Sequence, residues 1–182
     1  MKITTARSIA ILLFASAAAY AAEPHTIRAP LQAPAVRKPA PAFQLLDASG
    51  KARRNSSYRG KVLLLDFWAT ECGGCKQEIP AFIALQNSYR RKGLTAVGVS
   101  MDIAYENLKD AAEAWARVKP FVRSQQLNYA ILMGDDRVTK AYDIQAMPAT
   151  YLIDKTGRIA ATYVGVVDRN DIEANIKMLL NE

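Results

Sequence analysis

Two cysteines separated by two residues are the side chains in this chain with the clearest capacity for chemistry. Cys72 and Cys75 are the only cysteines among 182 residues, and Gly73-Gly74 lies between them. A disulfide across so short a loop constrains the unfolded chain little, so it contributes little stability. Such a bridge is better explained by its reactivity, which predicts reversible thiol–disulfide exchange. A structural zinc site needs four ligands, and His25 is the only histidine.

The residues around the pair predict a strand that leads into a helix. The nearly uninterrupted apolar run from Val62 to Ala69 is typical of a strand buried on both faces. A helix is expected from about Gly73 to Lys92, kinked by Pro80 and stopped by Gly93. At its start, free N–H groups and the helix dipole would stabilise a Cys72 thiolate, making it a nucleophile. Cys75, one turn inside, suits the step that resolves a mixed disulfide.

Two carboxylates flank the pair at spacings that suit proton transfer. Asp66 is the only charge in the predicted strand, six residues before Cys72, and Glu78 follows Cys75 by three residues, about one helical turn. Burial raises the pKa of a carboxyl toward neutral pH, where it can accept the proton that Cys75 loses. Either residue could instead be structural, and the sequence leaves open which of them handles the proton.

The remaining pattern predicts an α/β fold, with a central mixed sheet and helices on both faces. A short hairpin is expected at the start, from Phe43 to Leu46 with a turn at Ala48-Ser49-Gly50. From Val62 onward the order is βαβαβαββα, which makes parallel strands first and an antiparallel pair last. The further expected elements are a strand over 94–100, helical structure over 106–126 broken at Pro120, a strand over 129–133, a short helix over 136–142, a hairpin over 150–154 and 159–166, and a last helix capped by Asp168.

The first 41 residues are expected to lie outside the folded domain. Lys2 and Arg7 precede a short apolar run, and Ala19-Tyr20-Ala21 fits a small-x-small cleavage pattern, which predicts a signal peptide over residues 1–21. The apolar run is short for a membrane span, so a retained anchor is less favoured. Residues 22–41 hold five of the eight prolines and are expected to form an extended tether. The folded domain is predicted to span 42–182.

The charge balance gives no reason to expect a nucleic-acid partner. The formal net charge is +7, and it falls to +5 without residues 1–21, with 22 basic against 17 acidic residues. Nucleic-acid binding would favour a clustered basic stripe with interleaved aromatic residues, and the sequence has none.

Residues 40–182 resemble the thioredoxin superfamily, and within it the exported TlpA/ResA-like thiol–disulfide reductases. The resemblance rests on Phe67-Trp68-Ala69-Thr70, the Cys72/Cys75 pair, Glu78-Ile79-Pro80, Arg59-Gly60-Lys61, and Met147-Pro148-Ala149-Thr150-Tyr151-Leu152-Ile153-Asp154 with Gly157. It implies a thioredoxin-like fold with a helical insertion. It also implies that Pro148 is a cis-proline facing the dithiol, that Trp68, Met147 and Pro148 bind the substrate, and that the backbone at Met147 pairs with an extended partner segment.

The same resemblance implies a periplasmic, monomeric oxidoreductase that reduces protein disulfides without a metal or other cofactor. A membrane thiol donor would recharge it, and apocytochrome c or copper-site cysteines are the implied targets. This sequence departs from the family pattern at two places, which bear on the reduction potential of the dithiol and on the partner protein that it binds. Glu71 stands where Trp is usual, and a carboxylate there disfavours a thiolate. Gly73-Gly74 lacks the proline often found before the second cysteine, which leaves the turn less rigid.

Three alternative functions remain open. A disulfide-forming oxidase would usually carry a larger helical insertion than the stretch 104–127. A thiol peroxidase usually has a Thr and a Pro where this chain has Ala69 and Leu65. A copper chaperone of the related exported type needs a distant histidine, for which His25 is the only candidate.

Overall fold

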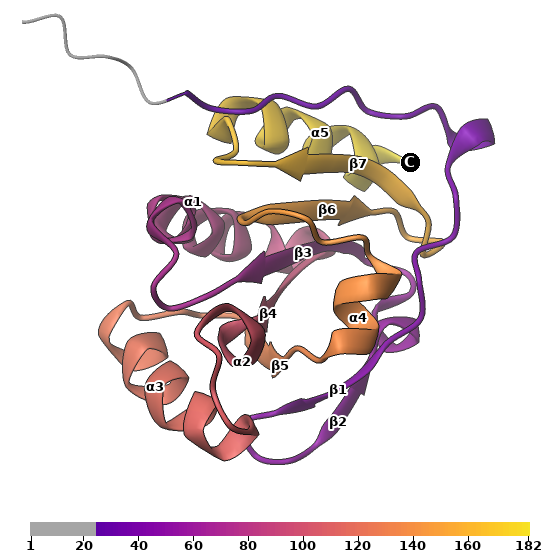
Figure 1. Cartoon of the computed structure of the whole chain (residues 1–182). Coiled ribbons are helices and arrows are strands. Elements are labelled where there is room, and N and C mark those ends of the chain that lie inside the picture. The colour runs from indigo at the N-terminus through magenta and orange to yellow at the C-terminus, as the bar shows by residue number, and fades with distance from the viewer. Residues whose placement is uncertain (1–24) are drawn as a thin grey trace, which may run out of the picture.

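Residues 25–182 are described by a computed structural model and form a seven-stranded sheet with flanking helices (Figure 1). The predicted signal peptide and the first residues of the predicted tether lie outside the described residues. The strands are β1 (Gln44–Asp47), β2 (Ala52–Arg54), β3 (Val62–Trp68), β4 (Leu94–Ser100), β5 (Ala130–Met133), β6 (Ala149–Ile153) and β7 (Ile159–Val164). The α-helices are α1 (Gly73–Tyr89), α2 (Asp102–Tyr105), α3 (Ala111–Ser124), α4 (Asp136–Ala141) and α5 (Arg169–Asn181). Within the described part of the chain, no helix has the length and apolarity to cross a membrane.

The sheet is mixed, as the sequence predicts, and its order is β2-β1-β5-β4-β3-β6-β7. Strand β3 lies between β4, to which it is parallel, and β6, to which it is antiparallel. All seven residues of β3 are buried, which explains why its sequence is apolar almost without interruption. The predicted opening hairpin is β1–β2, and it joins the sheet through an antiparallel pairing of β1 with β5.

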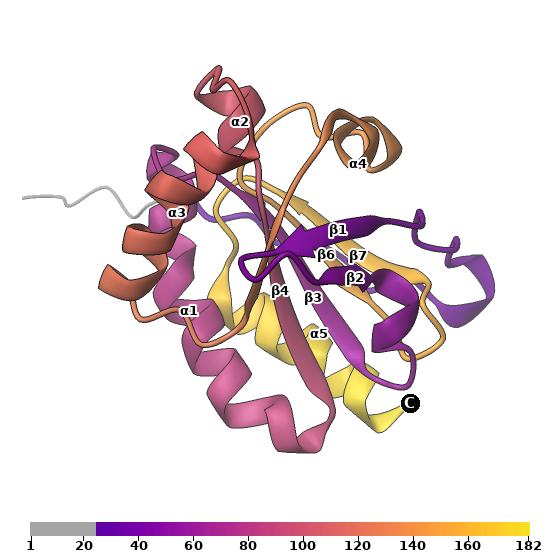
Figure 2. The same cartoon turned by 90° about the horizontal axis from the view of Figure 1, so that it is seen from below.

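Helices cover both faces of the sheet, as predicted, and each face has its own apolar core. Alternate residues of β3 point to opposite faces: Leu64 and Trp68 belong to one core, and Leu65 and Phe67 to the other. Helices α1, α3 and α5 contribute to the first core and α4 to the second. Figure 2 shows α1 and α5 on one side of the sheet and α4 on the other. The buried face of β3 that carries Asp66 therefore lies under α1.

The helical region expected over 106–126 differs from the prediction in two ways. A separate short helix, α2, precedes this region, and α3 begins only at Ala111, because the Asp110 carboxylate accepts hydrogen bonds from the N–H groups of Ala112 and Glu113. The break predicted at Pro120 is wrong, since α3 continues to Ser124. The fixed φ of proline is compatible with a helix, so Pro120 removes one backbone donor without ending it.

Residues 25–41 pack against the domain, in contrast to the free tether that the sequence predicts. The segment is extended, as its prolines favour, and it runs along β7 and α5 (Figure 1). Ile27 forms a bridge with Val167, and Pro39 forms one with Arg158. The buried Arg37 guanidinium lies 3.1 Å from an Asp154 carboxylate oxygen and also pairs with Glu182, the last residue. The sheet edge at β7 is therefore covered by the N-terminal segment.

Candidate active site

The two cysteines form a disulfide at the N-terminus of α1. Cys72 is the N-cap residue of the helix, and the Cys75 N–H donates to Cys72 Sγ across 3.2 Å. Only 4% of Cys72 and 2% of Cys75 are exposed. The same N–H faces the Cys72 sulfur when the bridge is reduced and the helix is retained, and it would then stabilise a thiolate there. The structure thus places the predicted nucleophile at the helix end, as its spacing indicates.

The segment before Cys72 is fastened to the end of β4 by Asp102. The Thr70 N–H donates to one carboxylate oxygen of Asp102 across 3.1 Å, and the Thr70 hydroxyl donates to the same oxygen. The Ser100 hydroxyl donates to the other oxygen at 2.8 Å. Asp102 is fully buried, so these donors replace its hydration. Asp102 was not among the predicted site residues, although an acid two residues after a buried strand is a signal that the sequence carries.

The two predicted carboxylates are both buried, Asp66 on β3 and Glu78 on α1, and they lie near each other. Burial raises the pKa of Asp66 to about 8. Burial also raises the pKa of Glu78 to about 9, and the nearby Asp66 adds to that rise, while a hydrogen bond from the Val167 N–H acts against it. That N–H lies 2.6 Å from Glu78 Oε1. Both groups are therefore suited to hold a proton at neutral pH and to exchange it.

A layer of buried polar atoms surrounds these carboxylates. Within residues 25–182, the following buried atoms have no hydrogen-bond partner: Asp66 Oδ1, Trp68 Nε1, Glu78 Oε2, Tyr129 OH and Thr150 Oγ1. Thr150 of β6 lies directly opposite Asp66 of β3. The pKa of Tyr129 is raised first by burial and then by the charges of Asp66 and Glu78, so its hydroxyl lies near both. Tyr129 was not among the predicted site residues, because only the order of the sheet brings it there.

Trp68 lies in the core, in contrast to the prediction that it binds substrate. Trp68 is 1% exposed, and its ring stacks on the ring of Phe121 of α3 with a centroid separation of 5.3 Å. Its indole passes over Gly98 of β4, where a Cβ would lie 2.7 Å from Trp68 Nε1. The side chain therefore supports the loop before Cys72 from inside and is not available to a docked partner.

Pro148 lies against the turn that holds the two cysteines. The Met147–Pro148 peptide bond is cis, as the resemblance implies. A Cβ on Gly74 would lie 3.1 Å from Pro148 Cδ and 3.2 Å from a methyl carbon of Val166. Glycine at position 74 therefore permits the close approach of these two side chains, which explains why this turn lacks a bulkier residue. Met147 is half-buried and packs against the two apolar cores.

Glu71 lies at the surface beside Cys72. Its side chain is 63% exposed, and its carboxylate lies 3.3 Å from the ammonium of Lys76, which is also largely exposed. The carboxylate and the ammonium therefore form an ion pair at the surface, next to the start of α1. Because both groups are hydrated, the pair contributes little to stability.

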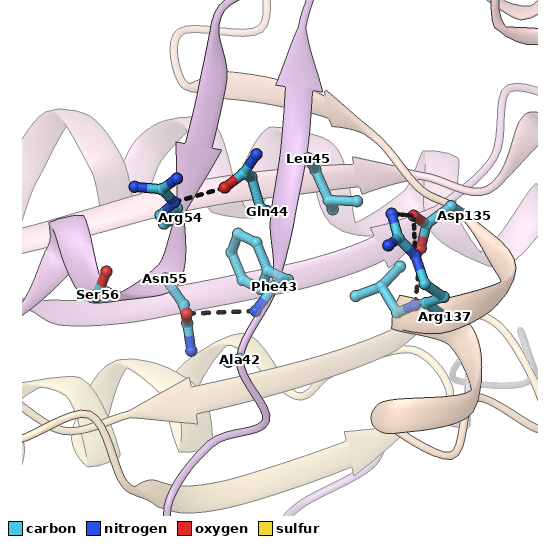
Figure 3. A pocket seen from close by; sticks show the side chains of 10 residues that line it. Ala42, Phe43, Gln44, Leu45, Arg54, Asn55, Ser56, Asp135 and Arg137 are labelled. Atoms are coloured by element: carbon cyan, nitrogen blue, oxygen red, sulfur yellow. Dashed lines mark hydrogen bonds and ion pairs between the residues drawn. The ribbon is translucent and has the colours of Figure 1, made fainter.

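Of two surface cavities, only one is lined by a predicted site residue, Glu78. One of about 360 Å³ lies between α1 and α5, and its lining includes Glu78, Pro80, Val167 and Arg169. Another of about 400 Å³ lies near the start of β1, where Arg54 donates to Gln44 and Arg137 pairs with Asp135 (Figure 3). None of the predicted site residues lines this second cavity.

Among residues 25–182, no three His, Cys, Asp or Glu side chains are grouped as a metal site would need.

Comparisons with known proteins agree with this geometry. The sequence profile of the AhpC/TSA family matches residues 36–162. The thiol-disulfide oxidoreductase ResA of Geobacillus kaustophilus (strain HTA426) is 32% identical over 145 residues, which are 80% of this chain and 78% of that protein. The thioredoxin-like protein YneN of Bacillus subtilis (strain 168) is 32% identical over 139 residues, 76% of this chain and 77% of YneN. The crystal structure of a thiol:disulfide interchange protein from Chlorobium tepidum TLS superposes with a TM-score of 0.67 at 27% identity, covering 81% of this chain and 99% of that one.

Proposed function

We propose that this chain, which belongs to the AhpC/TSA family, reduces disulfides of exported proteins by exchange through Cys72 and Cys75. It is a thiol–disulfide oxidoreductase with a thioredoxin-like fold. The observation that carries the proposal is the placement of the Cys72–Cys75 disulfide at the start of α1, with Pro148 against the turn between the cysteines and with two buried carboxyls on the adjoining elements β3 and α1. The reducing direction, the location and the clients are the finer parts of the proposal.

The reaction transfers two electrons to the client in two exchange steps. In the first, the Cys72 thiolate attacks one sulfur of the client disulfide, and the second client sulfur leaves as a thiolate. In the next, Cys75 loses its proton and attacks Cys72 Sγ, which releases the first client sulfur. The client then carries two reduced sulfurs, and the enzyme carries the Cys72–Cys75 disulfide present in the structure.

Asp66 and Glu78 are the groups that we assign to the proton of Cys75. Both are buried, and burial holds the pKa of each near or above neutral pH. Glu78 also lines a cavity between α1 and α5, so it can pass a proton onward from the interior. We therefore propose that Glu78 exchanges the proton with solvent. Asp66 raises the pKa of Glu78 and so stabilises the protonated form of Glu78.

The charges near the sulfurs favour the reducing direction. A dithiol is a strong oxidant when its reduced form is stabilised, above all by a stable thiolate. Here the carboxylate of Glu71 precedes Cys72 and engages the ammonium of Lys76. The buried ionisable groups of the site, Asp66 and Glu78, are carboxyls and not cations. A thiolate in these surroundings gains less stabilisation, so the reduced protein gives up its electrons more readily.

Features of the sequence support the location and the partners that we propose. The predicted signal peptide over residues 1–21 supports export to the periplasm, where a membrane thiol donor would restore the dithiol. The proposed clients are disulfides of exported proteins, including cysteines that receive haem or copper. We propose that the protein acts as a monomer on such clients, with the backbone at Met147 pairing with an extended client segment.

Two alternatives make different demands on this site. A thiol peroxidase would need polar groups that activate a peroxide at Cys72, but the nearby Thr70 hydroxyl donates to Asp102. A disulfide-forming oxidase would use the same sulfurs in the opposite direction, so only measured rates separate it from a reductase.

The experiment that tests the proposal compares reduction of a client disulfide with formation of a client disulfide, both through Cys72 and Cys75. The reduced protein, freed of small thiols, is mixed with a folded protein that carries an exposed disulfide, and the oxidised protein is mixed with a reduced, unfolded protein. We expect the reduced form to transfer its electrons in stoichiometric amount, and the Cys72→Ala variant to transfer none. Faster donation of the disulfide by the oxidised form, or faster consumption of peroxide than of disulfide, would contradict the proposal.

A further inference from the structure

The loop between β7 and α5 touches the active site at three points. Its Val167 N–H donates to Glu78 Oε1 across 2.6 Å. The Gly165 N–H donates to the carbonyl oxygen of Pro148 at 2.9 Å. The side chain of Val166 lies against Gly74, between the two cysteines. The position of this loop, residues 165–168, therefore sets where the buried carboxylate and the cis-proline lie relative to the sulfurs.

The opposite side of this loop is held by the N-terminal segment, over residues 26–29, which we call the strap. The Ile27 N–H donates to the Val166 carbonyl at 2.6 Å, and the Asp168 N–H donates to the Ile27 carbonyl at 2.8 Å. These two bonds enclose Val167, whose own N–H points to Glu78. The strap thus pairs with the loop through one parallel β-bridge between Ile27 and Val167, and Glu78 accepts a hydrogen bond from the Val167 N–H, which this bridge leaves free.

The loop is shaped to receive the strap. Gly165 has a φ of +111°, which side chains rarely adopt, and a Cβ there would lie 2.9 Å from Ile27 Cγ1. The strap is also fixed to α5: the Ala29 N–H donates to Asp171 at 3.1 Å, and the Asn175 amide donates to the Ala29 carbonyl at 2.9 Å. Its attachment is therefore specific and involves neither cysteine.

We propose that the strap is a positioning element of the active site, in which the backbone of Ile27 holds the loop so that the Val167 N–H stays on the Glu78 carboxylate. The inference rests on the proposed function, since it assigns the strap an effect on the proton of Cys75. Ile27 acts through Val167 and touches neither sulfur, so it is a positioning residue. Nothing in the composition of a proline-rich segment indicates such a role, which depends on the contact with Val166 and Asp168.

The effect on Glu78 follows from the groups that face it. Asp66 of β3 and Tyr129 lie near it in the interior, and Arg169 of α5 lines the cavity beside it. The Val167 N–H is the group that lowers the pKa of Glu78 against burial and against the charge of Asp66. If the loop loosens, the carboxylate loses this donor, and its pKa rises further above the usual range.

The experiment uses the Ile27→Pro variant of the full chain, which lacks the backbone N–H that donates to the Val166 carbonyl. The matched control is Gln32→Pro, which removes a backbone N–H from the same N-terminal segment: the Gln32 N–H donates to the Ala160 carbonyl at 2.8 Å, away from the loop. Ile27→Val keeps the N–H and serves as the conservative variant. Two quantities are measured: the exchange rate of the Val167 amide, and the rate at which Cys75 resolves a mixed disulfide as a function of pH.

We expect Ile27→Pro to expose the Val167 amide to exchange and to slow the resolving step about fivefold at neutral pH, the loss of about one hydrogen bond. Its pH profile should move to higher pH, while Gln32→Pro and Ile27→Val keep wild-type values. With Glu78→Gln in the background, Ile27→Pro should slow the step no further. An unchanged Val167 amide, a profile moved to lower pH, or an equal effect of Gln32→Pro would overturn the proposal. A wild-type protein that reduces no disulfide refutes the proposed function instead, and the amide exchange then still decides the role of the strap.

Discussion

Replacing Asp66 by asparagine should make the protein more stable, and increasingly so as the pH rises. Asp66 is fully buried, and burial raises its pKa to about 8. In the unfolded chain the same group has a pKa of about 3.9. Between these two values the unfolded state releases a proton that the folded state keeps, so stability falls as the pH rises through this window. Asparagine is nearly the same shape and carries no titratable proton, so it removes the contribution of Asp66 to this fall.

The magnitude follows from the width of the window. Each pH unit between the two pKa values changes the free energy of unfolding by about 1.4 kcal/mol. A window of about four units sets an upper value of about 6 kcal/mol, and entry of water around the ionised group reduces it. We therefore expect the advantage of Asp66→Asn to be small near pH 4 and to reach about 3 to 5 kcal/mol near pH 9.

Urea unfolding of the oxidised wild type and of Asp66→Asn, at several values from about pH 4 to pH 9, measures this difference directly. Glu78 is present in both proteins, so its own titration contributes to both curves. A stability difference that does not change with pH would refute the account, because it would mean that Asp66 is ionised in the folded protein throughout. An advantage that shrinks as the pH rises would refute it equally.

Three further predictions concern the cysteines, the sheet and the N-terminal segment. The Cys75→Ala variant should accumulate mixed disulfides with exported proteins, visible as bands that disappear on reduction, and a variant that captures nothing would contradict its resolving role. Gly98→Ala should destabilise the protein by about 1 to 3 kcal/mol, because the new methyl group would lie 2.7 Å from Trp68 Nε1; unchanged thermal unfolding would show that the indole can move aside. Arg37→Ala should cost about 3 kcal/mol in denaturant unfolding, because it leaves the Asp154 carboxylate buried without its partner, and a loss below about 1 kcal/mol would show that water replaces the guanidinium.

The parts of the site that the sequence predicts are those encoded by neighbouring residues. The buried strand that precedes Cys72, the helix that begins after it and the glycine that ends this helix are all local signals. The structure confirms the strand at β3 and the start of the helix at α1, which ends earlier than predicted, at Tyr89. A 3-10 turn over Arg90–Lys92 follows, and Gly93, whose φ is +106°, ends it. The cis bond between Met147 and Pro148 agrees with the family resemblance, which rests in part on the motif over residues 147–154.

The parts that the sequence does not predict depend on which strands are neighbours. Asp102 reaches Thr70 only because β4 pairs with β3 in parallel register. The family resemblance implies that Trp68 binds substrate, but the absence of a side chain at Gly98 lets its ring lie inside. The N-terminal segment shows a third case: its prolines predict an extended chain correctly, but nothing local reveals that the chain lies against β7 and α5.

The reduction potential of the Cys72–Cys75 couple tests the central claim most directly. It is measured by equilibrating the protein with a thiol–disulfide buffer of known potential and quantifying the oxidised and reduced forms. Because the carboxyl groups around the sulfurs do not favour a thiolate, we predict a potential below about −200 mV, toward the reducing end of the range for such proteins. A potential near about −120 mV, where strong oxidants lie, would contradict the assignment as a reductase.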